Sequence, residues 1–219
     1  MLFKDRTDAG RYLAGKLKEY AGQKDVMVLA LPRGGVPVAF EVATALDLLM
    51  DIFLVRKLGV PGQEELAMGA IASGGVRVLN EEIIRDLGIP DYAIAAVAAQ
   101  EQRELERREK LYRRDMGSLD VKGKSVILID DGLATGASMR AAALALRQLK
   151  AKEVIVAVPV AASDTCEAFR SEVDRIVCAK TPEPFYGVGF WYQDFSQTTD
   201  QKVIELLEKA THEKSSAHP

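Results

Sequence analysis

The chain has 219 residues, of which 48% are hydrophobic and 28% are charged, and its formal charge is −3. This is the composition of an ordinary soluble globular protein, long enough to bury a core without disulfides or a structural metal. The charge leaves no basic excess that could coat nucleic acid or an anionic membrane, so neither partner is expected.

The numbers and positions of cysteine and histidine exclude several classes of catalytic and metal site. Cys166 and Cys178 are too few for a disulfide scaffold or a four-thiolate zinc site, and as free thiols they suit a reducing cytoplasm. The start of the chain lacks an apolar signal segment and no apolar run approaches the length of a membrane span, which also favours the cytoplasm. Both histidines, His212 and His218, lie in the polar tail, so histidine-based hydrolase or zinc chemistry is not expected.

The regular pattern of the chain predicts an α/β fold. A helix is expected from about Thr7, and apolar residues recur at helical spacing from Val38 to Leu49 and from Met139 to Leu149. Between them lie short apolar runs without alternation, which is typical of strands buried on both faces. These runs are Val26–Leu31, Ile52–Val55, Val126–Ile129, Val154–Val160 and Ile176–Cys178. Alternating strands and helices favour a central, mostly parallel sheet flanked by helices.

Two segments depart from this alternation. Gly74-Gly75 separates two short apolar runs and predicts a hairpin. The segment Asp91–Asp115 has no proline or glycine, carries many charges and keeps a partial apolar face, which predicts one long amphipathic helix. Its charges fit a solvated face with local ion pairs better than a partner-binding surface. A last helix is expected over Lys202–Ala210, so residues 1–210 form one domain and residues 211–219 a disordered tail.

One stretch carries most of the functional argument. The apolar run Val126–Ile129 delivers Asp130 and Asp131 to the end of a predicted strand, where ligands bind in such sheets. A short loop with glycines and hydroxyls then leads into a helix, whose first amides favour a phosphate. The carboxylates can accept hydrogen bonds from the hydroxyls of a sugar beside that phosphate. A simple capped turn is the alternative, but the full pattern favours a phosphosugar site.

This stretch closely resembles the 5-phosphoribosyl-1-pyrophosphate (PRPP) signature of type I phosphoribosyltransferases, and the chain looks closest to the stand-alone bacterial group of that family. The resemblance covers roughly residues 1–210. It implies that PRPP is bound by Asp130, Asp131, Gly132, Leu133, Ala134, Thr135, Gly136, Ala137 and Ser138.

The resemblance extends to other segments. Arg33-Gly34-Gly35 matches the family's pyrophosphate loop, and Arg56-Lys57 ends the second predicted strand at the same sheet edge. These residues are therefore expected to bind PRPP as well, although Arg56 and Lys57 could equally be solvated surface charges. The segment 59–79 corresponds to the mobile catalytic loop and hairpin, which excludes water when it closes.

The family's chemistry sets further expectations. Pyrophosphate leaves C1 of the ribose with Mg²⁺ neutralising its charge, and a nitrogenous acceptor attacks through an oxocarbenium-like transition state. Positioning and charge stabilisation dominate such a reaction. By this resemblance Arg33, Lys57, Asp130 and Asp131 are the catalytic residues, and the two aspartates are the candidate Mg²⁺ ligands, with most of the metal's ligands supplied by PRPP. The family is often dimeric, which makes a homodimer possible.

The acceptor is harder to infer. Ala134 stands where hypoxanthine-guanine members of the family have Asp, which weakens a 6-oxopurine assignment without arguing against catalysis. A hood over the acceptor is expected from about residues 1–20 and 180–210. Within it, Trp191 and Tyr192 are the candidate acceptor contacts. The alternative for most of these aromatic residues is a small satellite core that packs on the N-terminal helix through Phe3 and Tyr12.

Two other functions remain open. A PRPP-binding regulator without turnover would use the same site, and a hydrolase would transfer the phosphoribosyl group to water. The retained Arg33, Lys57, Asp130 and Asp131, together with the segment of the mobile loop, favour the transferase.

Overall fold

The centre of the molecule is a parallel five-stranded sheet. The computed structural model describes residues 2–113 and 119–216. The strand order is β2-β1-β6-β7-β8, and every neighbouring pair is parallel. The strands are β1 (Val26–Ala30), β2 (Leu49–Ile52), β6 (Ser125–Ile129), β7 (Glu153–Val158) and β8 (Arg175–Cys178). The predicted α/β fold with a central parallel sheet is confirmed.

Two neighbouring inner strands, β1 and β6, are buried along their whole length. Every residue of β1 and β6 is buried, which explains why both read as continuous apolar runs. In the register of the sheet, Ala30 of β1 is paired with Ile129 of β6. The carboxyl ends of these two strands therefore lie at the same edge of the sheet. The loops that follow β1 and β6 begin next to each other there.

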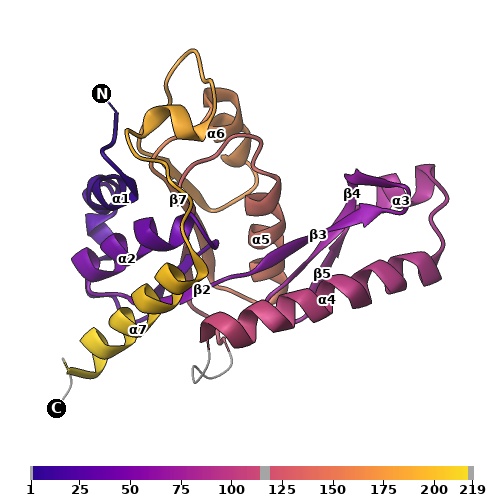
Figure 1. Ribbon diagram of the computed structural model, residues 1–219, viewed down its shortest axis with the longest axis horizontal. Helices are drawn as coiled ribbons and strands as arrows, with labels where there is room; N and C mark the ends of the chain where they lie inside the picture. The colour runs from indigo at the N-terminus through magenta and orange to yellow at the C-terminus, as the bar shows by residue number, and fades with distance from the viewer. Residues whose placement is uncertain (1, 114–118, 217–219) are drawn as a thin grey trace.

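Helices cover both faces of the sheet (Figure 1). On one face, one core cluster contains residues of α1 (Arg6–Ala14), α2 (Gly35–Leu46) and α7 (Asp200–Ser216). A second core cluster joins the sheet to α5 (Ala137–Gln148) and α6 (Ser163–Phe169). The short 3₁₀ helices are η1 (Lys18–Tyr20) and η2 (Val188–Trp191).

An arm projects from this core (Figure 1). It contains an antiparallel sheet of β3 (Val55–Val60), β4 (Gln63–Ala72) and β5 (Val76–Leu79), followed by α3 (Glu81–Asp86). The predicted hairpin at Gly74-Gly75 is the turn between β4 and β5. The long α4 (Asp91–Arg113) lies beneath this sheet and returns the chain to the core, where its end lies near α7 (Figure 1).

Some element boundaries differ from those predicted. The apolar run Ile52–Val55 is not one strand: Ile52 ends β2, and Val55 begins β3 in the other sheet. Leu49 belongs to β2 rather than to the preceding helix, because that helix ends at Leu46 with Asp47 in a left-handed conformation. The predicted end of the long helix, residues 114 and 115, lies outside the described residues.

The last helix is longer than the sequence pattern predicted. α7 continues to Ser216, so residues 211–216, which were expected to be disordered, are helical. The hydroxyl of Thr211 donates to the carbonyl of Leu207. No glycine or proline interrupts the chain before Pro219, which explains how the helix can extend.

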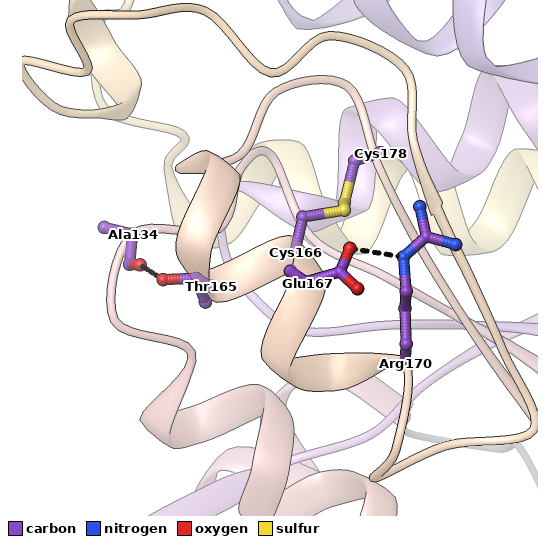
Figure 2. Close-up of a disulfide and its surroundings, with 6 residues drawn as sticks. All are labelled: Ala134, Thr165, Cys166, Glu167, Arg170 and Cys178. Carbon is purple, nitrogen blue, oxygen red and sulfur yellow. Dashed lines mark hydrogen bonds and ion pairs between the residues drawn. A yellow bond between two sulfur atoms is a disulfide. The ribbon is translucent and has the colours of Figure 1, made fainter.

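The prediction that both cysteines are free is wrong. Cys166 of α6 and Cys178 at the end of β8 form a disulfide (Figure 2). Sequence pattern does not reveal that α6 packs against β8 and brings the two thiols together. Because disulfides are rare in cytosolic proteins, the argument for the cytoplasm that rested on free thiols no longer holds. Within residues 2–113 and 119–216, no helix is both long and apolar enough to cross a membrane.

Candidate active site

The most informative loop connects β6 to α5. The buried strand ends at Ile129 and places Asp130 and Asp131 at the carboxyl edge of the sheet. Gly136 is the N-cap residue of α5 and has a φ of 77°, a conformation that disfavours other residues. A Cβ at this position would also collide with the ring of Phe169. Glycine is therefore required at the point where the loop turns into the helix.

The two aspartates are half-buried at the edge of the sheet. Burial, followed by the negative charge of Asp131, raises the pKa of Asp130 well above its ordinary value. Burial also raises the pKa of Asp131, although a nearby arginine opposes this effect. The backbone N–H of Asp131 donates to Oδ1 of Asp130 at 2.8 Å. Two adjacent, half-buried carboxyl groups with raised pKa values are typical of functional sites.

The arginine beside Asp131 is Arg6, which the sequence analysis did not identify. Its Nε donates to Oδ2 of Asp131 at 2.8 Å, and its Nη1 donates to the carbonyl of Ser196 at 2.7 Å. The guanidinium also lies 4.0 Å from the centre of the Phe195 ring. Arg6 thus joins helix α1, the loop after β6 and the segment after η2. No local pattern around Arg6 indicates this role.

The loop between β1 and α2 holds the predicted pyrophosphate-binding residues. A Cβ on Gly35 would lie 2.7 Å from the carbonyl oxygen of Ile129, and a Cβ on Gly34 would overlap the Asp131 carboxylate. The two glycines therefore allow this loop to touch the loop after β6. Arg33 lies in the same loop, at the carboxyl edge of the sheet. Its Nη1 lies 3.5 Å from Oδ1 of Asp200 in α7.

Arg56 and Lys57 do not end a strand as predicted, because both lie inside β3. Adjacent strand residues point to opposite faces, and the two side chains line different cavities. Arg56 lines a cavity of about 100 Å³ together with Pro32, Asp130 and Ser138. Lys57 lines a neighbouring cavity of about 410 Å³ between the arm and α5. The structure therefore places Arg56 in the same cavity as Asp130 and Lys57 in the neighbouring one.

The rest of the loop after β6 is held by its backbone. The N–H of Leu133 donates to the carbonyl of Val160, and the carbonyl of Ala134 accepts from the hydroxyl of Thr165 at 2.6 Å (Figure 2). The carbonyl of Thr135 accepts from Arg140. These contacts fix the loop, while the first amides of α5, which begins at Ala137, have no partner within the helix and can bind an anion. Ser138, in the first turn of α5, lines both cavities.

Gly132 lies where the loop meets the proposed hood. A Cβ there would collide with the side chain of Val188 in η2. This close contact means that the hood segment rests directly on the loop that carries the aspartates.

The aromatic residues proposed for the acceptor lie in the same region. Tyr192 is buried with Phe3, Ala9 and Val160, and its hydroxyl donates to the carbonyl of Asp131. Phe3 also contacts the ring of Tyr12, as the predicted satellite core requires. Trp191 is half-buried, and in the described part of the chain its Nε1 is a buried nitrogen without a hydrogen-bond partner. Contact of either residue with an acceptor stays a prediction. Of the two, Trp191 has an N–H group, at Nε1, that donates to no described residue.

Comparison with known proteins assigns the family. A family model described as "Phosphoribosyl transferase domain" matches residues 4–190. The chain belongs to the phosphoribosyl transferase family. The resemblance inferred from the loop after β6 is thereby confirmed.

Several relatives of this family member resemble it over nearly its whole length. It is 46% identical over 209 residues to "Putative phosphoribosyl transferase Rv0571c" of Mycobacterium tuberculosis H37Rv and to the corresponding protein of strain CDC 1551, with 95% of the chain covered. The match covers 47% of each, so the chain spans about half the length of the curated relatives it matches. The protein TT1426 from Thermus thermophilus, whose crystal structure is known, is 40% identical, with a TM-score of 0.85 over 95% of this chain and 99% of that one.

Proposed function

We propose that this member of the phosphoribosyl transferase family transfers the 5-phosphoribosyl group of PRPP to a nitrogenous acceptor and releases pyrophosphate. The observation that carries the proposal is the contact between two loops at one sheet edge. Asp130 and Asp131 follow β6, and Arg33-Gly34-Gly35 follows β1 at the same level of the sheet. One loop offers carboxylates for sugar hydroxyls, and the other offers a cation for a diphosphate.

The arrangement supports a role for each group. Asp130 and Asp131 would accept hydrogen bonds from the ribose hydroxyls, and the first amides of α5 would bind the 5′-phosphate. Arg33 and Arg56 would hold the diphosphate and stabilise its charge as the bond to C1 breaks. Lys57 lies in the adjacent cavity, so its proposed catalytic role requires movement of the arm over the substrate.

Magnesium fits this site only in combination with the substrate. Carboxylate oxygens suit Mg²⁺, but Asp131 is paired with Arg6. Among residues 2–113 and 119–216, no group of three or more His, Cys, Asp or Glu side chains could hold a metal ion. We therefore propose that the oxygens of PRPP supply most of the metal's ligands, with Asp130 and Asp131 as the protein's candidate donors. There Mg²⁺ would neutralise charge on the leaving group.

A binding and turnover experiment tests the proposal. PRPP is titrated with Mg²⁺ by calorimetry, and pyrophosphate release is then measured with purines, pyrimidines, ammonia and water as acceptors. We expect binding and release with one nitrogenous acceptor. Release with water alone would identify a hydrolase, and binding without release from any acceptor would identify a PRPP sensor.

A double variant tests the assigned residues. Asp130→Asn with Asp131→Asn keeps the shape of both side chains but removes the charged acceptors for the ribose hydroxyls. We expect PRPP binding to be lost while the circular dichroism spectrum stays that of the parent protein. If the folded variant binds PRPP with the parent affinity, the site is assigned to the wrong residues.

A further inference from the structure

Helix α4 presents a stripe of four residues to the candidate active site. Glu101, Leu105, Arg108 and Tyr112 are spaced by four, three and four positions, so they share one face of the helix. Leu105 is fully buried and Tyr112 is nearly so. The side chain of Glu101 on this face is only 17% exposed. The prediction that the charges of α4 lie on a solvated face is therefore wrong for Glu101.

The two ends of this stripe hold the two cations assigned above to the diphosphate. Oε2 of Glu101 accepts from Nε of Arg56 at 2.7 Å, and Nη2 of Arg56 lies 2.6 Å from the same oxygen. Tyr112 donates its hydroxyl to Oδ1 of Asp200, and the same oxygen lies 3.5 Å from Arg33. Burial, followed by this bond to Asp200, raises the pKa of Tyr112 to about 12, so the hydroxyl remains a donor at neutral pH.

Arg108 lies between these two contacts. It lines the same cavity of about 100 Å³ as Pro32, Arg56 and Asp130. Its Nε donates to Oε1 of Glu104 at 2.8 Å, and its terminal nitrogens make no hydrogen bond to any described residue. A guanidinium with two unused terminal nitrogens, which together carry four N–H donors, therefore lies in the cavity where the diphosphate is expected.

The partner of Arg108 is shared with a second arginine. Arg107 holds Glu104 through both Nε, at 2.7 Å, and Nη2, at 3.0 Å. The hydrogen bonds from these two arginines keep the pKa of Glu104 at about 2. One carboxylate thus faces two guanidinium groups, which leaves one positive charge in excess. Arg107 can retain Glu104 when Arg108 turns toward an anion.

We propose that Arg108 is a third arginine of the diphosphate subsite and binds the diphosphate of PRPP and the released pyrophosphate directly. The inference rests on the proposed function and adds a binding residue to it. The physical basis is that a guanidinium with free terminal nitrogens binds phosphate oxygens in a bidentate manner. Helix α4 then has two roles, since it positions Arg33 and Arg56 through their partners and supplies Arg108 itself.

Arg107 provides a matched control for testing this role. It is adjacent in sequence and shares Glu104, but its side chain is 63% exposed. We measure the affinity for inorganic pyrophosphate with Mg²⁺ by calorimetry in the parent protein, Arg108→Gln and Arg107→Gln. Since a hydrogen bond to a charged group contributes about 1.5–3 kcal/mol, the dissociation constant of Arg108→Gln should rise at least about tenfold. Arg107→Gln should reduce the affinity by less than Arg108→Gln does, because Arg107 does not line the cavity and can act only through Glu104.

A second ligand separates binding from a general structural effect. Ribose 5-phosphate lacks the diphosphate, so its affinity should be the same in Arg108→Gln and in the parent protein. Arg108→Lys keeps the charge and should bind pyrophosphate more tightly than Arg108→Gln. Equal losses for both ligands, or equal losses in the Arg107 and Arg108 variants, would overturn the inference, as would unchanged pyrophosphate affinity in Arg108→Gln. If the parent protein binds neither PRPP nor pyrophosphate, the proposed function itself fails.

Discussion

At the scale of single residues, the pair of Arg6 and Asp131 connects the site to the N-terminal helix. The two side chains are 11% and 15% exposed, so each charge is largely removed from water. A buried carboxylate without a partner is costly, and its neighbour Asp130 would repel it as well. Arg6 therefore allows two acidic groups to stay close together at the sheet edge.

Removing Arg6 should destabilise the fold. Arg6→Met leaves the Asp131 carboxylate buried and unpaired, and the loss of one partner from a buried ion pair costs about 3 kcal/mol. We expect a decrease of that size in the free energy of unfolding, measured with urea. Arg11→Met is the control, because Arg11 of the same helix pairs with Glu41 at the surface, and it should leave the unfolding midpoint unchanged. Equal midpoints for the two variants would show that the Arg6 pair is not stabilising.

Residues of the site differ in how far the sequence could identify them. Asp130, Asp131 and Arg33 were predicted because each lies in a short loop directly after an apolar strand, and the two strands proved to be neighbours. Arg6 is 125 positions from its partner, and Asp200 is 167 positions from Arg33. Such pairs depend on how helices pack across the sheet, which the local pattern of a single sequence does not encode.

At the scale of elements, α6 supports the loop after β6 from behind. Thr165 donates to the carbonyl of Ala134 (Figure 2). The ring of Phe169 fills the space beside Gly136. The adjacent Cys166 ties this short helix to the end of β8. A helix of one or two turns has little stability of its own, so this covalent link helps to keep it against the loop.

Loss of the disulfide should lower the stability of the protein. The bridge closes a loop with a sequence separation of 12 residues, for which chain entropy gives about 3 kcal/mol. We expect Cys166→Ala with Cys178→Ala to lower the free energy of unfolding by about that amount. Dithiothreitol should shift the urea midpoint of the parent protein in the same direction and leave the variant unchanged. A parent midpoint that is insensitive to dithiothreitol would contradict this expectation.

Elements were predicted best where one periodicity dominates. The buried strands β1 and β6 and the turn at Gly74-Gly75 follow directly from apolar runs and glycine placement. The run Ile52–Val55 was misread because two strands of different sheets meet there with only two residues between them. The face of α4 that contacts the site was missed because its apolar residues alternate with charged ones. Glu101 pairs with Arg56 of β3, and Arg108 pairs with Glu104 of the same helix.

At the scale of the whole molecule, the site is assembled from distant parts of the chain. Its groups come from α1, the loop after β1, β3, α4, the loop after β6 and α7, between Arg6 and Asp200. In the unfolded chain these groups are far apart and do not form a binding site. A ligand of this site should therefore bind the folded state and stabilise the entire domain rather than one segment.

Addition of PRPP should raise the unfolding temperature. A ligand that binds only the folded state stabilises it by about 2.7 kcal/mol when its free concentration is 100 times its dissociation constant. We expect PRPP with Mg²⁺ to produce this increase within a single unfolding transition followed by circular dichroism. The double variant Asp130→Asn and Asp131→Asn should show no shift at the same concentration. Two separate transitions, of which only one responds to PRPP, would mean that the arm and the parallel sheet unfold independently and that α4 does not join them into one cooperative site.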